Sequence, residues 1–267
     1  MSSDSIKTMV REKYGTIAKA SETKKSSCCS SGCCGSGEVD YTVFSQDYSK
    51  LDGYVPEADL GLGCGIPVES AKIKKGATVI DLGSGAGNDC FIVRRMVGET
   101  GYVIGIDMTE EMIGKAKKNN AKMGYDNVEF RLGEIEKLPV DDAVADVVIS
   151  NCVLNLVPDK RKAFGEIIRV LKKDGHFNIS DIVIEGELPA KLRTVAELYA
   201  GCISGAVSKK EYLQIIKDAG FGNISISSEK NIDIPDDLLL QYMNEKDLKE
   251  VRSSAKIVSI TVYGEKS

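Results

Sequence analysis

The chain has 267 residues, of which 42% are hydrophobic, and its 35 basic and 40 acidic side chains give a formal net charge of −5. This length suggests between one and two domains at about 150 residues each. No apolar run approaches the roughly 20 residues that cross a bilayer, and the first residues lack the apolar stretch of a secretory signal. No basic stripe marks a nucleic-acid binder. We therefore expect a soluble, cytoplasmic protein that acts on a small molecule, without nucleic-acid or membrane partners.

The numbers of histidines and cysteines limit the kinds of catalytic or metal site that this chain can form. His176 is the only histidine, which excludes histidine-rich zinc sites, and we expect it to begin a buried strand rather than to act in catalysis. The eight cysteines, by contrast, are many for a cytoplasmic chain, where reducing conditions disfavour a disulfide framework. These thiols indicate soft-ligand or redox chemistry.

Composition divides the chain into four parts. Residues 1–37 read as a flexible, Cys-rich N-terminal arm with a short helix over 6–20, because a Ser/Gly/Cys segment cannot build a core. Residues 38–75 hold turn signals and several tyrosines and read as a lid. Residues 76–185 form the main alternating core, and residues 186–267 complete the sheet and add further helices.

Within the core, short apolar runs alternate with amphipathic segments. We expect strands over 78–81, 102–106, 127–132, 146–150, 176–181, 224–228 and 257–263. We expect helices over 88–97, 110–123, 161–171 and 189–200 and from 208 onward, with Asn88, Thr109 and Ser208 as caps. The alternation predicts an α/β fold with a doubly wound, mostly parallel, seven-stranded sheet.

The turn after the first expected strand carries the first functional motif. Residues 81–88 read DLGSGAGN, so Asn88 stands where a dinucleotide-binding loop would have its third glycine. The carboxylate of Asp81 suits an ammonium group better than a phosphate. Asp107 ends the second strand, where it can accept hydrogen bonds from both ribose hydroxyls, and Glu134 follows the third strand near an adenine edge.

This pattern resembles class I S-adenosylmethionine methyltransferases, although a structural turn or a nicotinamide site could produce the glycine loop alone. The resemblance implies S-adenosylmethionine as the cofactor and the Rossmann-like fold of that class. The residues that it assigns to cofactor binding are Asp81, Gly83, Ser84, Gly85, Gly87, Asp107, Met108, Glu134, Ile135 and Asn151.

Three cysteines from distant segments could converge over the methyl donor. Cys152 follows the fourth strand, Cys64 lies in the lid sequence GLGCGIP, and Cys202 lies in YAGCISGA. Thiolates select soft ions, and three of them suit the trigonal pyramidal geometry of trivalent arsenic, whereas zinc requires a fourth ligand. Isolated cysteines are often only small core residues, and we interpret Cys90 in this way.

The stretches GLGCGIP, VIDLGSGAGNDCF, VIGIDMT, VEFRLGEIEKLP, VISNCVLNLVPDK and YAGCISGA together resemble arsenite S-adenosylmethionine methyltransferases. The resemblance implies that Cys152 and Cys202 hold trivalent arsenic, that Cys64 is a third ligand, and that Cys64 pairs with an N-terminal cysteine during turnover. Cys33 or Cys34 is our choice for that partner, because they lie closest to the lid. The implied substrate is arsenite or its glutathione conjugate, and the implied reductant is thioredoxin or glutathione.

One departure and two alternatives remain open. Some relatives carry a tyrosine just before the lid cysteine, where this chain has Leu62 and Gly63, so Tyr41 or Tyr48 could close over the methionine part of the cofactor. A methyltransferase of a small organic acceptor, such as a quinone, would share the cofactor loop without needing the three thiols. A thiol-rich arsenite-binding protein on the same fold would bind arsenite without methyl transfer.

Overall fold

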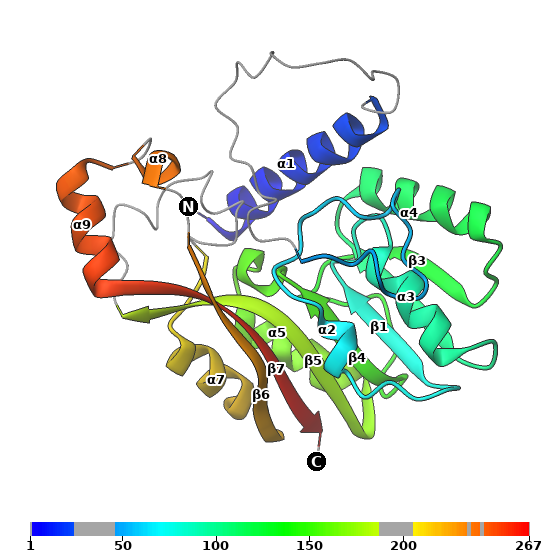
Figure 1. Cartoon of the computed structure of the whole chain (residues 1–267). Helices are drawn as coiled ribbons and strands as arrows, with labels where there is room; N and C mark the ends of the chain where they lie inside the picture. The colour runs from blue at the N-terminus through cyan, green and yellow to red at the C-terminus, as the bar shows by residue number, and fades with distance from the viewer. Residues whose placement is uncertain (1, 24–45, 187–204, 234–235, 241–242, 267) are drawn as a thin grey trace.

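A computed structural model describes residues 2–23, 46–186, 205–233, 236–240 and 243–266. Its centre is a seven-stranded sheet in the order β3-β2-β1-β4-β5-β7-β6 (Figure 1). The strands are β1 (Thr78–Leu82), β2 (Tyr102–Asp107), β3 (Val128–Leu132), β4 (Ala145–Asn151), β5 (Leu171–Gly186), β6 (Phe221–Ile232) and β7 (Ala255–Lys266). Strands β1 to β5 pair in parallel, and β7 runs antiparallel to both β5 and β6. The predicted doubly wound, mostly parallel sheet is confirmed.

Helices cover both faces of this sheet. The helices are α1 (Ser3–Thr23), α2 (Pro67–Ser70), α3 (Asn88–Val97), α4 (Glu110–Met123), the 3₁₀ turn η3 (Leu154–Leu156), α5 (Lys160–Val170), α7 (Lys209–Asp218), α8 (Asp236–Leu239) and α9 (Glu245–Ser254). Helices α3 and α4 pack against one face and α5 and α7 against the other. Successive strand residues alternate between the two faces, so Val79 packs toward α3 and Ile80 toward α5.

The ends of several elements differ from the expectation. Strands β5 and β7 are longer than predicted because they pair with each other from His176 opposite Glu265 to Gly186 opposite Ala255. Helices α8 and α9 were not predicted, and the helix expected over 189–200 lies outside the described residues.

One of the three predicted caps is confirmed. The Ser208 side chain accepts the backbone N–H of Glu211 and caps α7. Thr109 occupies the cap position of α4, but its side chain makes no capping hydrogen bond. Asn88 is not a cap, because the left-handed Gly87 (φ 97°) fills that position and Asn88 is already helical. Its side chain lines a cavity instead.

Helix α1 extends beyond the predicted 6–20 at both ends and lies beside α4 (Figure 1). An ion pair of 2.8 Å joins Lys19 of α1 to Glu111 of α4. This part of the expected arm therefore packs on the core. Cys33 and Cys34 lie outside the described residues, and the division into arm, lid, core and C-terminal part stays a prediction.

Candidate active site

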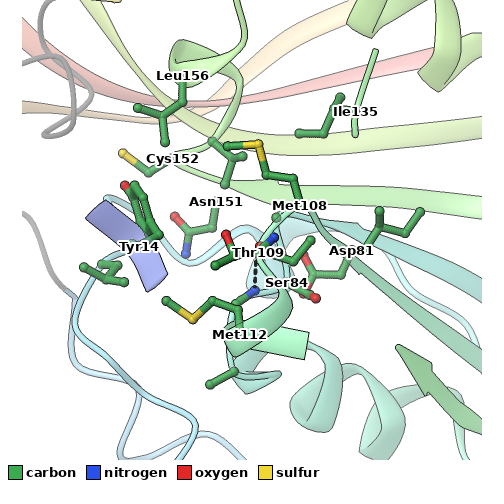
Figure 2. A pocket seen from close by; sticks show the side chains of 18 of the residues that line it. Tyr14, Asp81, Ser84, Met108, Thr109, Met112, Ile135, Asn151, Cys152 and Leu156 are labelled. Carbon is green, nitrogen blue, oxygen red and sulfur yellow. Dashed lines mark hydrogen bonds between the residues drawn. The ribbon is translucent and has the colours of Figure 1, made fainter. Parts of the chain in front are cut away.

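A cavity opens where the carboxyl ends of β1, β2 and β4 meet α1 and the segment before α2 (Figure 2). In an open, mostly parallel sheet this is the usual place for a ligand. The residues predicted for the cofactor that line this cavity are Asp81, Gly83, Ser84, Gly85, Asp107, Met108, Glu134, Ile135 and Asn151. Gly87 lies in the same loop at the start of α3.

The glycine loop is hydrogen-bonded to the end of β2. The backbone N–H groups of Gly83 and Ser84 both donate to the carbonyl of Ile106, at 2.7 and 3.0 Å. The N–H of Gly85 donates to Asp107 Oδ2 at 3.0 Å, and Asp107 Oδ1 accepts the N–H of Thr109 at 2.9 Å. The loop and the predicted ribose-binding carboxylate therefore form one unit.

The cavity is acidic and holds polar atoms that lack partners. Burial raises the pKa of Asp81 well above its usual range and that of Asp89 to about 6. Within the described residues, Ser84 Oγ, Asn88 Oδ1 and Asp89 Oδ1 are buried without a hydrogen-bond partner. Acceptors of this kind fit a cationic ligand that also carries donors. The sulfonium, ammonium and ribose hydroxyls of S-adenosylmethionine satisfy these conditions.

One predicted thiol lines this cavity, and a second is buried in the same apolar cluster as the first. Cys152 lines its wall directly after β4, and Figure 2 shows it beside Asn151 and Tyr14. Cys152 has a φ of 61°, a left-handed conformation that residues other than glycine seldom adopt. Cys64 is 1% exposed and belongs to the same apolar cluster as Cys152, together with residues of α1, η3 and β5. The structure thus brings Cys64 and Cys152 into one buried environment.

The other cysteines do not complete a metal site among the described residues. Cys202, like Cys33 and Cys34, lies outside these residues, so its place in the arsenic site stays a prediction. In the described part of the chain, no group of three or more His, Cys, Asp and Glu side chains could hold a metal ion. Cys90 is buried in α3 and its Sγ donates to Asp81 Oδ2 at 3.2 Å, which agrees with a packing role.

Helix α1 supplies cavity residues that the sequence analysis missed. Lys7 and Tyr14 both line the cavity from α1. Lys7 pairs with Glu134 at 2.8 Å and with Glu136, while Arg11 lies 3.4 Å from Glu134. Glu134, which we predicted to lie near the adenine of the cofactor, is thus ion-paired with two basic residues of α1. No periodicity could indicate this contact, because 127 residues separate Lys7 from Glu134.

Two further side chains in the cavity wall are the aromatic Tyr48 and the acidic Asp89. Tyr48, one of the two proposed aromatic residues, lines the cavity and is 4% exposed, whereas Tyr41 lies outside the described residues. Asp89 also lines the cavity and was not predicted, although its place directly after the glycine loop and Asn88 could have indicated it. His176 contacts the carbonyl of Ala71 at 2.7 Å, and it is not among the residues that line the cavity.

The sheet order, the glycine loop at the end of β1 and the acidic cavity define a class I methyltransferase fold. The chain belongs to the methyltransferase domain family, whose pattern matches residues 73–220. None of the helices in the described ranges is long and apolar enough to span a membrane.

Several of the proteins that this chain resembles are arsenite methyltransferases. The chain is 40% identical over 260 residues to one from Halobacterium salinarum, covering 93% of this chain and 65% of that protein. It is 39% identical over 168 residues to the human arsenite methyltransferase, covering 60% of this chain and 44% of that protein. The crystal structure of an arsenic(III) S-adenosylmethionine methyltransferase from Chlamydomonas reinhardtii matches with a TM-score of 0.64 and 32% identity, over 75% of this chain and 66% of that chain.

These relatives confirm the resemblance found in the sequence. The chain spans at most about two thirds of the length of each of these relatives.

Proposed function

We propose that this chain transfers methyl groups from S-adenosylmethionine to thiol-bound trivalent arsenic. The observation that carries the proposal is the place of Cys152 in the wall of the acidic cavity, with Cys64 buried in the same cluster. A methyltransferase acting on an organic ring would have no need for thiols at this point. The likeness to arsenite methyltransferases of three organisms supports the same substrate.

In this proposal one set of residues binds the cofactor and three thiols bind the arsenic. When bound, S-adenosylmethionine supplies an electrophilic methyl group on a sulfonium. Asp81 and Asp107 orient the ammonium and ribose groups, and the glycine loop keeps the backbone close to them. Cys64, Cys152 and Cys202 take arsenite from its glutathione conjugate by thiol exchange.

Three sulfur ligands leave one lone pair on trivalent arsenic, which is the nucleophile. No general base is needed, since arsenic loses no proton as the new bond forms. The apolar cluster around Cys64 and Cys152 excludes water, and holding both reactants in one cavity lowers the entropic part of the barrier.

Methylation leaves arsenic in the pentavalent state, and two electrons are needed to return it to the trivalent state. We propose that two protein thiols supply them by forming a disulfide, with Cys64 joined to Cys33 or Cys34. Thioredoxin or glutathione then restores both thiols by thiol–disulfide exchange.

The test measures arsenite-dependent formation of S-adenosylhomocysteine by the full chain with glutathione present. Cys64→Ser and Cys152→Ser should each lower this rate at least about 100-fold. Cys90→Ser is the matched control and should retain most of it, because a serine hydroxyl can still donate to Asp81. Arsenite-independent activity on a quinol that survives in the Cys152→Ser variant would instead favour an organic acceptor. Tight arsenite binding without turnover would favour a binding protein.

A further inference from the structure

The side chain of Asn151 joins the two segments that carry the buried thiols. Asn151 ends β4 and directly precedes Cys152. Its Oδ1 accepts the backbone N–H groups of Cys64 and Gly65 at 3.1 and 3.2 Å. Its Nδ2 donates to the carbonyl of Gly65 at 2.9 Å and to the hydroxyl of Tyr48 at 2.7 Å. One amide group therefore uses both its acceptor and its donors to hold the loop around Cys64.

The fit between this amide and the loop is close. A Cβ added at Gly63 would lie closer than 3.0 Å to Asn151 Nδ2, so the loop reaches this distance only with glycine at that position. The same Nδ2 lies 3.4 Å from Asp89 Oδ2, and the Tyr48 hydroxyl also donates to the Gly65 carbonyl at 3.0 Å. The amide thus also connects the loop to the acidic wall of the cavity.

The backbone on either side of the two thiols is fixed as well. The carbonyl of Cys64 accepts a hydrogen bond from the Ser259 hydroxyl of β7 at 2.7 Å. The N–H of Cys152 donates to the carbonyl of Ser180 in β5 at 2.8 Å. The Cys64 peptide is held from β7 and Cys152 is held from β5, and the side chain of Asn151 connects the two segments directly.

We propose that Asn151 is a positioning residue that sets the separation of Cys64 and Cys152 and thereby prepares the arsenic-binding pair. This rests on the proposed function and goes beyond the cofactor contact expected for Asn151. An aspartate of the same shape could still accept from Cys64 and Gly65 but could not donate to Gly65 or Tyr48. An alanine would make none of these bonds and would remove the side-chain acceptor of the Cys64 and Gly65 N–H groups.

The probe is phenylarsine oxide, a trivalent arsenical that exchanges its oxygen for two thiols. Its affinity for the full reduced chain is measured calorimetrically, and the site lost in the Cys64→Ser variant identifies the pair. Asn151→Ala should weaken binding at that site at least about tenfold, as expected for the loss of several hydrogen bonds. Asn151→Asp keeps the two accepted bonds but sets a carboxylate oxygen against the Gly65 carbonyl and Asp89, so it should also bind more weakly than the wild type.

Asn127→Ala is the matched control. Asn127 is a buried asparagine remote from the thiols, whose Nδ2 donates to the carbonyls of Gly98 and Gly101 at 3.0 and 2.7 Å. This variant should bind phenylarsine oxide like the wild type. Equal weakening in the Asn127→Ala and Asn151→Ala variants would overturn the positioning role, since general loss of stability would then explain both.

Wild-type affinity in both Asn151 variants would also overturn it. The proposed function fails on a different result, namely a wild-type chain that binds phenylarsine oxide at this pair but transfers no methyl group to arsenite. That result would leave the role of Asn151 intact.

Discussion

At Gly83 an added methyl group would collide with Val153, which follows Cys152 and lines the same cavity. Gly83 also has a φ of 70°, where glycine carries no steric penalty. The cofactor loop and the segment that carries Cys152 are thus in direct contact at this residue.

Gly83→Ala should therefore lower both stability and cofactor affinity. We expect the free energy of unfolding to fall by about 1–3 kcal/mol, as for overpacking combined with an unfavourable φ. Gly114→Ala is the matched control, because Gly114 lies in α4 with open space around it and should gain about 0.5–1 kcal/mol. Urea unfolding measures the free energy of unfolding of both variants. Equal changes in the two variants would contradict the packing argument.

Helix α1 illustrates what could and could not be predicted at the level of elements. A shorter helix over 6–20 was predicted from the sequence. Most strands and helices of the core were predicted from their apolar spacing, which is a local property. The docking of α1 depends on ion pairs of Lys7 with Glu134 and Glu136, which are brought together only by the fold. Asp81 and Asp107 could be predicted by their spacing from the glycine loop, whereas Tyr14 could not, since nothing in its surroundings distinguishes it from other helix residues.

Removing the Lys7 charge should loosen α1. The Lys7 side chain is 20% exposed and lies between two carboxylates, so Lys7→Met leaves both without this cation. We expect hydrogen exchange of the α1 amides to become at least about tenfold faster. Lys19→Met should change it little, because the Lys19 side chain in its pair with Glu111 is 71% exposed. Unchanged exchange in the Lys7→Met variant would show that apolar contacts alone hold α1.

Over the whole molecule, buried carboxyl groups make stability depend on pH. Burial raises the pKa of Asp181 to about 7 and that of Asp89 to about 6. The folded state then binds protons more tightly than the unfolded state from about pH 4 to 7, so the free energy of unfolding falls as pH rises through this range. Carboxylates with lowered pKa, such as Glu134 and Glu166, act in the opposite direction but only below about pH 4.5.

Asp181→Asn should make this pH dependence shallower. The hydroxyl of Tyr212 in α7 donates to Asp181 at 3.1 Å. Burial raises the pKa of Asp181, and the positive charge of Lys160 in α5 partly offsets that rise. An asparagine keeps an acceptor for Tyr212 but takes up no proton. Urea unfolding at pH 5, 6 and 7 should show a slope reduced by at most about 1.4 kcal/mol per pH unit. An unchanged slope would show that Asp181 titrates normally.

The most direct test of the central claim is to follow the methyl group itself. The full chain is incubated with arsenite, glutathione, a thioredoxin system and S-adenosylmethionine carrying a trideuterated methyl group, and the arsenic species are separated by chromatography and mass spectrometry. We predict methylated arsenicals that contain the trideuterated methyl group and that are absent with the Cys152→Ser variant. A chain that binds S-adenosylmethionine but produces no labelled arsenical would contradict the account.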